Sequence, residues 1–186
     1  MATAVKDRLI RATTELMRRH GVAGTAVAEI LSTSGAARRS IYLNFPNGKS
    51  ELVTEATRVA GESMAVALAD IVASDDPIGL FTQVWVELLE STDFEAGCPI
   101  VAAGLGRADS EDAAELAGAV FAEWYALVAG RMVDEGVAPE VAESLAVTVV
   151  SAIEGAVIAC QAQRTVVPLR QVSARLTDLV AMHVPT

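Results

Sequence analysis

Apolar side chains recur at three- and four-residue spacing along almost the whole chain, which is the repeat of an amphipathic helix. In residues 4–20 they share one face, and most basic residues lie off that face. The same spacing predicts further helices over residues 50–73, 77–91, 111–135, 139–163 and 168–183, with a short helix after Pro99. Since no run alternates as a half-buried strand does, the pattern predicts an all-α fold of about nine helices.

Glycine and proline divide the first 48 residues into three short helices. We expect Gly21 to end the first helix and the Thr25 hydroxyl to cap the second. Gly35 then marks a tight turn before a third helix at about 37–45, which Pro-Asn-Gly ends. Two helices joined in this way form a helix-turn-helix unit. We therefore expect a helix-turn-helix domain over residues 1–48 and a second helical domain over residues 49–186.

The charges of the chain are divided unevenly between these two parts. The chain carries 14 basic and 24 acidic residues, for a net charge of −10. Residues 1–50 hold eight basic and three acidic residues, a local net charge of +5, so the remainder carries −15. This asymmetry has two interpretations: a solvated helix face, or a basic head that binds a polyanion such as DNA.

The third helix has the side chains that a DNA recognition helix needs in the major groove. Arg38 and Arg39 lie in its first turn, where an arginine fork can bond guanine O6 and N7. Ile41 and Phe45 are apolar and are expected to pack against the other helices. The remaining candidate DNA contacts are residues expected to reach a base, the groove or a phosphate: Ser40, Tyr42, Leu43, Asn44 and Lys49. Tyr42 and Lys49 are expected at phosphates.

The run TAVAEILSTSGAARRSIYLNFPNGKSEL, residues 25–52, resembles the DNA-binding signature of TetR-family transcriptional regulators. Pro-Asn-Gly before Lys49, together with Gly97-Cys98-Pro99, resembles the LmrA/YxaF-like branch. The resemblance implies a homodimer of all-α subunits on a palindromic operator, repression relieved by a small molecule, and a variable C-terminal ligand domain. It also implies a phosphate contact from Thr25.

Three positions depart from the pattern of that family. Ala37 stands where a serine usually caps the recognition helix, and a missing cap costs about 1 kcal/mol. Arg39 stands where a small residue is common, and two adjacent arginines suggest an operator rich in G and C. Leu31 replaces an alanine of the second helix, so the packing there must differ.

The acidic C-terminal part is expected to bind an effector and to form the dimer. An effector site requires an apolar cavity with a few polar groups, and the candidate lining residues are Met64, Phe81, Trp85, Cys98, Phe121, Trp124 and Tyr125. The acidic charge favours a neutral or cationic lipophilic compound. The helices over about 139–163 and 168–183 are too apolar for solvent, and two from each subunit would form a four-helix interface.

Parts of the sequence also fit three other classes of protein: a membrane protein, an enzyme and a helical adaptor. Residues 144–163 approach the length of a membrane span, but Glu154 lies at their middle and no basic flank frames them. An enzyme could use Cys98 as nucleophile with His20 or His183 as base, although no third orienting group is evident. A helical ligand-binding or adaptor protein without DNA binding is the remaining alternative. The N-terminal segment has charges where a signal peptide has an apolar core, so we expect a cytoplasmic protein without metal or cofactor.

Overall fold

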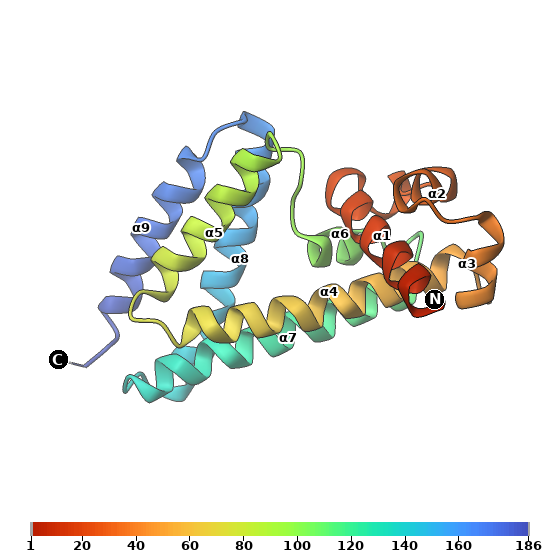
Figure 1. The fold of residues 1–186 in the computed structure, drawn as a ribbon. Coiled ribbons are helices and arrows are strands. Elements are labelled where there is room, and N and C mark those ends of the chain that lie inside the picture. The colour runs from red at the N-terminus through yellow and green to blue at the C-terminus, as the bar shows by residue number, and fades with distance from the viewer. Residues whose placement is uncertain (1, 186) are drawn as a thin grey trace. The chain divides into compact units, whose positions relative to one another are not determined.

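The computed structural model describes residues 2–185, and this part of the chain forms nine α-helices and no strand. The helices are α1 (Ala2–Gly24), α2 (Val27–Ser34), α3 (Arg38–Asn44), α4 (Lys49–Val72), α5 (Pro77–Ser91), α6 (Pro99–Leu105), α7 (Glu111–Asp134), α8 (Pro139–Gln163) and α9 (Val167–Ala181). Figure 1 shows them in chain order from red to blue. The all-α prediction and the expected number of helices are confirmed.

The first compact unit comprises residues 1–63 and 98–120. In it α1 packs against α2, α3 and α6, so a short helix from the middle of the sequence joins the three N-terminal helices. The core contains Leu9, Met17, Ile30, Ile41 and Leu52, all almost fully buried. Gly106, at the end of α6, lies so close to Val22 that an added Cβ would approach the Val22 Cβ to 2.7 Å.

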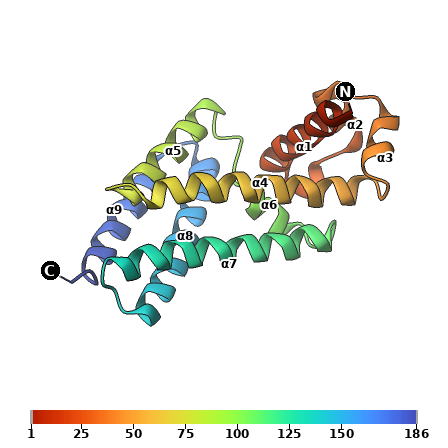
Figure 2. The same cartoon turned by 60° about the horizontal axis from the view of Figure 1, so that its bottom comes forward.

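The second compact unit comprises residues 64–97 and 121–186. Here α5 packs against both α8 and α9, and α8 runs beside α9, as Figure 2 also shows. A buried hydrogen bond between the hydroxyls of Thr82 and Ser173, 2.6 Å long, joins α5 to α9. The ends of α4 and α7 complete this unit, and together these five helices surround its apolar interior.

The expected helix boundaries hold at Gly21 but not at Thr25. Gly21 has φ +69° and breaks the regular helix, as a C-cap glycine does. The second helix, however, is preceded by Ala26, and no side chain caps it. The Thr25 hydroxyl donates to the Gly21 carbonyl at 2.7 Å instead, and the residue is fully buried. The expected Thr25 cap is therefore wrong, because the hydroxyl closes the preceding turn.

The strongly apolar composition of α8 follows from its place in the second unit. Both α7 and α8 have the length and hydropathy of a membrane span, but half of the most apolar window of α8 is buried within the protein. The buried side chains include Leu145, Val149, Ile153 and Val157, at helical spacing. The charged residue at the middle of the run, Glu154, is buried as well. Packing inside a helical unit thus accounts for the apolar sequence of α8.

Candidate DNA-recognition surface and ligand pocket

The recognition helix α3 is fixed to its unit by two buried side chains. Ile41 and Phe45 are each 1% exposed, which confirms their predicted packing role. After α3 the chain turns at Gly48, whose φ of +74° favours glycine. Gly48 also lies close to Tyr42, since a Cβ there would meet the Tyr42 ring at 3.5 Å. This local geometry determines which face of α3 is turned to solvent.

The solvent face of α3 carries the side chains that the sequence predicts for DNA contact. Arg38 and Arg39 are exposed, as are Tyr42 (53% exposed) and Leu43 (68% exposed). Ser40 and Asn44 are half-buried at its edge, where the Asn44 amide donates to the Ser40 carbonyl at 2.7 Å. We call these six residues the recognition surface. Exposed arginines beside an exposed aromatic ring and an aliphatic side chain suit base edges, phosphates and thymine methyl groups.

Two predicted phosphate ligands, Thr25 and Lys49, have partners within the protein. Because Thr25 is buried and its hydroxyl is bonded to Gly21, its side chain is not available to a phosphate in this conformation. The Lys49 ammonium donates to the Val22 carbonyl at 3.0 Å. An ammonium has three protons, so this bond leaves capacity for a phosphate oxygen. Lys49 therefore joins the end of α1 to the start of α4 and can still serve as a phosphate ligand.

The N-cap of α3 is the weak point that the sequence indicates. Ala37 precedes the helix with φ −75° and ψ 147°, the extended geometry of an N-cap residue, but no side chain caps the helix. The first turn of α3 also contains no acidic residue and begins with two arginines, which is unfavourable for the helix dipole. The recognition helix thus begins without either of the usual stabilising groups.

A charged network ties α1 to α4 below the recognition helix. Lys6 bonds Glu55 at 2.9 Å and lies 5.7 Å from the centre of the Phe45 ring. Arg58 bonds the same carboxylate at 2.8 Å and also Glu62 at 2.5 Å. The hydrogen bonds from Arg58 and then from Lys6 lower the pKa of Glu55 from 4.5 to about 2. Glu55 therefore stays charged at neutral pH and well into the acidic range.

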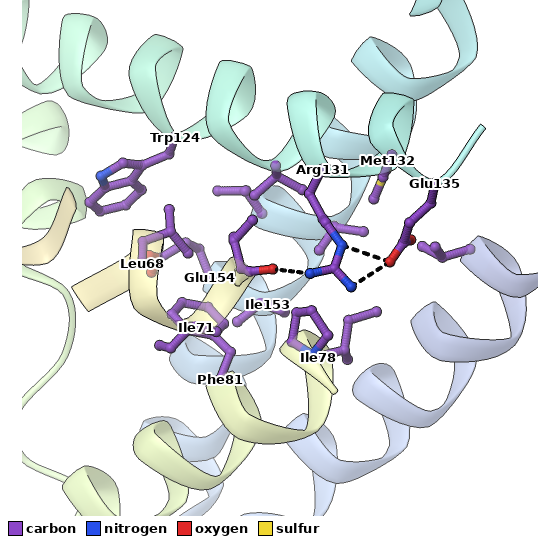
Figure 3. A pocket seen from close by; sticks show the side chains of 16 residues that line it. Leu68, Ile71, Ile78, Phe81, Trp124, Arg131, Met132, Glu135, Ile153 and Glu154 are labelled. Atoms are coloured by element: carbon purple, nitrogen blue, oxygen red, sulfur yellow. Dashed lines mark hydrogen bonds and ion pairs between the residues drawn. The ribbon is translucent and has the colours of Figure 1, made fainter. Parts of the chain in front are cut away.

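The second unit contains an apolar pocket of about 120 Å³. Its wall comes from five helices, α4, α5, α7, α8 and α9, and is formed mainly by aliphatic and aromatic side chains: Leu68, Ile71, Val72, Pro77, Ile78, Phe81, Trp124, Val128, Met132, Val149, Val150, Ile153 and Val180. Figure 3 shows several of these side chains around the space. Apolar cavities of this size bind a compound with one aromatic ring.

Three charged residues, Arg131, Glu135 and Glu154, complete the pocket wall. The Arg131 guanidinium donates to Glu135 through Nε at 2.7 Å and through Nη2 at 2.6 Å. Its Nη1 donates to the carbonyls of Val72 at 2.7 Å and Ser74 at 3.2 Å. A cation at these carbonyls stabilises the C-terminal end of α4. In Figure 3 the Glu154 carboxylate and the Arg131 guanidinium point toward one another.

Of the seven residues predicted to bind a ligand, the pocket wall includes two, Phe81 and Trp124. Trp85 is buried, with its ring 6.4 Å from the Phe81 ring. The Phe121 ring meets the Trp124 ring edge-to-face at 5.3 Å and stacks on the Tyr125 ring at 6.2 Å. Four of the predicted residues lie in the second unit but outside the pocket wall: Met64, Trp85, Phe121 and Tyr125. The seventh, Cys98, belongs to the first unit. The aromatic residues thus lie near the pocket, but most of its wall is aliphatic.

The charged residues of the pocket were not among the sequence candidates. For Glu154 a signal existed, since it is the one charged residue in the apolar run 144–163. A lone carboxylate in an apolar helix is costly to bury and so marks a place where something compensates it. Arg131 gave no such signal, because its partners Val72 and Ser74 lie almost sixty residues away in the sequence.

The sulfhydryl groups do not form an exposed nucleophile. Both cysteines are buried. Burial raises the pKa of the Cys160 thiol, which keeps it protonated and unreactive. His20 and His183, the two bases considered for Cys98, are exposed at helix ends. This geometry offers no support for a cysteine enzyme.

Family models match both parts of the chain. Residues 9–56 match the model of bacterial regulatory proteins of the tetR family. Residues 76–175 match the model of the C-terminal domain of LmrA/YxaF-like transcriptional regulators. The two matches cover the recognition helix and most of the pocket wall, respectively.

Relatives of similar length agree with these matches. An uncharacterized HTH-type transcriptional regulator of Mycobacterium tuberculosis strain H37Rv is 33% identical over 186 residues, which cover 97% of this chain and 96% of that protein. The HTH-type transcriptional regulator LmrA of Bacillus subtilis is 27% identical and covers 94% of this chain and 96% of its own length.

Solved structures share the fold at lower identity. The regulatory protein TetR from Rhodobacter sphaeroides superposes with a TM-score of 0.82 at 20% identity, over 91% of this chain and 95% of that one. A TetR transcriptional regulator from Chloroflexus aurantiacus superposes with a TM-score of 0.81 at 24% identity, over 98% of this chain and 97% of that one. The family and the named relatives are transcriptional regulators and not enzymes. The chain belongs to the TetR family of transcriptional regulators, in its LmrA/YxaF-like branch.

Proposed function

We propose that this regulator is a repressor whose affinity for its operator is lowered by a small lipophilic ligand. The observation that carries the proposal is the recognition surface: two exposed arginines and an exposed tyrosine stand on a helix whose opposite face is locked by Ile41 and Phe45. Such a helix can enter the major groove, with arginines at base edges and the tyrosine at a phosphate. DNA binding and dimer formation are general in this family. We assign the DNA-binding part to residues 1–48 and the remaining functions to residues 49–186.

The pocket supports the effector part of the proposal. Its wall is largely apolar, it is drawn from five helices, and its polar groups are few. This is the composition expected for a small-molecule site. We propose that a ligand bound there lowers operator affinity, with Phe81 and Trp124 among its contacts. Met64, Trp85, Cys98, Phe121 and Tyr125 would affect a ligand only indirectly, through packing.

For the dimer we propose that α8 and α9 form the interface, in the cytoplasm and without membrane association. Apolar side chains remain exposed on these helices, including Val147, Ile158 and Val167, and the exposed Met182 follows α9 directly. Gly155, also on the solvent side of α8, permits a close approach of helices. A two-fold dimer through these helices would present two copies of α3 to the half-sites of a palindromic operator.

Fluorescence anisotropy on the DNA upstream of the protein's own gene tests the proposal. We expect specific binding that falls steeply with salt, because cations on the protein release counterions from the DNA. Footprinting should then reveal a palindrome. Absence of any salt-dependent binding to such DNA would contradict the regulator and favour a helical ligand-binding or adaptor protein. Activation of the adjacent gene in a reporter strain would contradict only the repressor assignment.

A further inference from the structure

The charged residues of the pocket determine which lipophilic ligands it can accept. We propose that the pocket selects a small cation, an aromatic or aliphatic ammonium compound, whose positive group is held by Glu154. This inference deepens the ligand-controlled repression proposed above. It rests on that function only for the effect of the ligand on DNA, because the charge preference itself belongs to the pocket.

The first support is the sign of the charge on the pocket wall. Two carboxylates, Glu135 and Glu154, share the wall with a single guanidinium, that of Arg131. However the three groups share their hydrogen bonds, one negative charge is left over. A cationic guest neutralises this charge, whereas an anionic guest adds to it at short range and in apolar surroundings, where such interactions are strong.

The second support is the position of the two carboxylates. Glu154 is 7% exposed and stands among apolar side chains, including Ile153 and Val150 from its own helix. The side chain of Glu135 is 34% exposed and receives two bonds from Arg131. Only Glu154 is therefore deep enough to meet the polar end of an enclosed ligand. A guest with an ammonium group could bond this carboxylate while its apolar part fills the pocket.

The third support is that Arg131 is already engaged. Its Nε and Nη2 bond Glu135, and its Nη1 bonds two carbonyls at the end of α4. An anionic ligand could take the guanidinium only at the expense of these bonds. A cationic ligand at Glu154 leaves the bonds of Arg131 to Glu135 and to the two carbonyls in place. The aromatic residues Phe81 and Trp124 add to the preference, since aromatic faces attract cations.

Three probes of similar size test the charge preference on the full chain: benzylammonium, its neutral isostere ethylbenzene, and benzoate. Binding is measured by isothermal titration calorimetry without DNA. We expect benzylammonium and ethylbenzene to bind and benzoate to bind at least about tenfold more weakly than benzylammonium. Failure of benzylammonium to bind at millimolar concentration, or tighter binding of benzoate, would overturn the proposal.

The variant Glu154→Gln separates charge from shape. We expect it to weaken benzylammonium about tenfold or more, as expected for loss of a charged hydrogen bond, while the affinity for ethylbenzene is unchanged or increased. Ethylbenzene binding thereby shows that the variant retains the pocket. Glu143→Gln is the matched control, because Glu143 lies on the same helix but is exposed and outside the pocket wall. An unchanged ratio of the two affinities in Glu154→Gln would refute the role of Glu154.

A separate experiment distinguishes the charge preference from the proposed function. Operator binding is measured with and without saturating benzylammonium. Both proposals would be supported if benzylammonium releases the operator from the wild-type protein but no longer releases it from Glu154→Gln. If benzylammonium binds in the pocket and the operator stays bound, the charge preference stands and ligand control by this cation fails. If the operator is released by ethylbenzene and benzylammonium does not bind, ligand control stands and the charge preference fails.

Discussion

The recognition surface of the first unit is mainly polar and exposed and comes from one seven-residue helix, whereas the pocket of the second unit is mainly apolar and comes from five helices. The two also differ in how their charges are held. Arg38 and Arg39 extend into solvent, while Arg131 is bonded to Glu135 and to two backbone carbonyls. A surface that must bind a polyanion keeps its cations accessible. In apolar surroundings an unpaired cation is costly, so the Arg131 guanidinium is held by partners within the fold.

The first unit also extends beyond the three N-terminal helices. The compact first unit includes α6, which the sequence separates from α1 by about eighty residues. The recognition helix therefore depends on packing contributed by the middle of the chain.

The largest expected effect is that of Gly106→Ala on the stability of the first unit. The new Cβ would approach Cγ2 of the buried Val22 to 2.6 Å and the Ala102 carbonyl oxygen to 3.2 Å. Overpacking of this kind costs about 1–3 kcal/mol, measured by urea denaturation. Gly104→Ala is the matched control, since its nearest neighbour is the Ala117 Cβ at 3.9 Å. Equal stability of the two variants would show that α6 does not constrain α1.

Removing an arginine of the recognition surface should affect DNA binding but not folding. Arg38→Ala or Arg39→Ala should lose about 1–3 kcal/mol of operator affinity for each bidentate base contact. Anisotropy titrations on operator and on scrambled DNA measure this loss. Arg175→Ala on α9, where the arginine is exposed and paired with Asp178, is the control and should leave binding unchanged. Equal losses on both DNAs would reduce these arginines to phosphate ligands.

The missing cap of α3 can be restored. Ala37→Ser should stabilise the recognition helix by about 1 kcal/mol, because the serine hydroxyl can accept from a free N–H of the first turn. Urea denaturation and amide exchange in α3 measure the gain. Ala28→Ser, at an exposed position inside α2, should be slightly destabilising, since serine is a weaker helix former than alanine. No gain for Ala37→Ser would mean that the helix is already ordered by its packing.

Lys49 has two proposed roles, as a phosphate ligand and as a donor to the Val22 carbonyl, and the salt dependence of DNA affinity distinguishes them. If Lys49 binds a phosphate, Lys49→Ala should lower the slope of log K against log salt by about 1 on every DNA sequence. If it acts only through the Val22 carbonyl, the slope should stay unchanged and the unfolding free energy should fall. Tyr42→Phe should weaken binding to all sequences alike without a change in slope, because its hydroxyl is uncharged.

The smallest expected effect is a pH dependence from Glu55. Its pKa is depressed from 4.5 to about 2 in the folded state, so its contribution is present above pH 4.5 and is lost as the pH falls toward 2. Because Lys6 and Arg58 are partly exposed, the contribution is about 0.2–1 kcal/mol. Acid unfolding of wild type and Glu55→Gln should therefore converge at low pH. A constant difference between them from pH 7 to pH 2 would contradict this assignment.

Local patterns predicted the helices and the buried face of α3 well. Pro46-Asn47-Gly48 ends α3, and the spacing of Ile41 and Phe45 correctly gives its buried face. The Thr25 cap was wrong, although it too is a local feature. A threonine can bond either the helix that follows or the turn that precedes it, and only the backbone path after Gly21 decides between them.

By itself, the sequence determined what depends on neighbours along the chain: the helices of residues 2–185, their approximate ends, the basic N-terminal quarter and the exposed face of α3. The tertiary structure alone decided the wall of the pocket, because its residues come from five helices and no periodicity says which side chains meet. It also decided that Arg131 holds the end of α4, since a hydrogen bond across almost sixty residues leaves no local trace. Helical periodicity records which face of a helix is buried, but not which partner covers it.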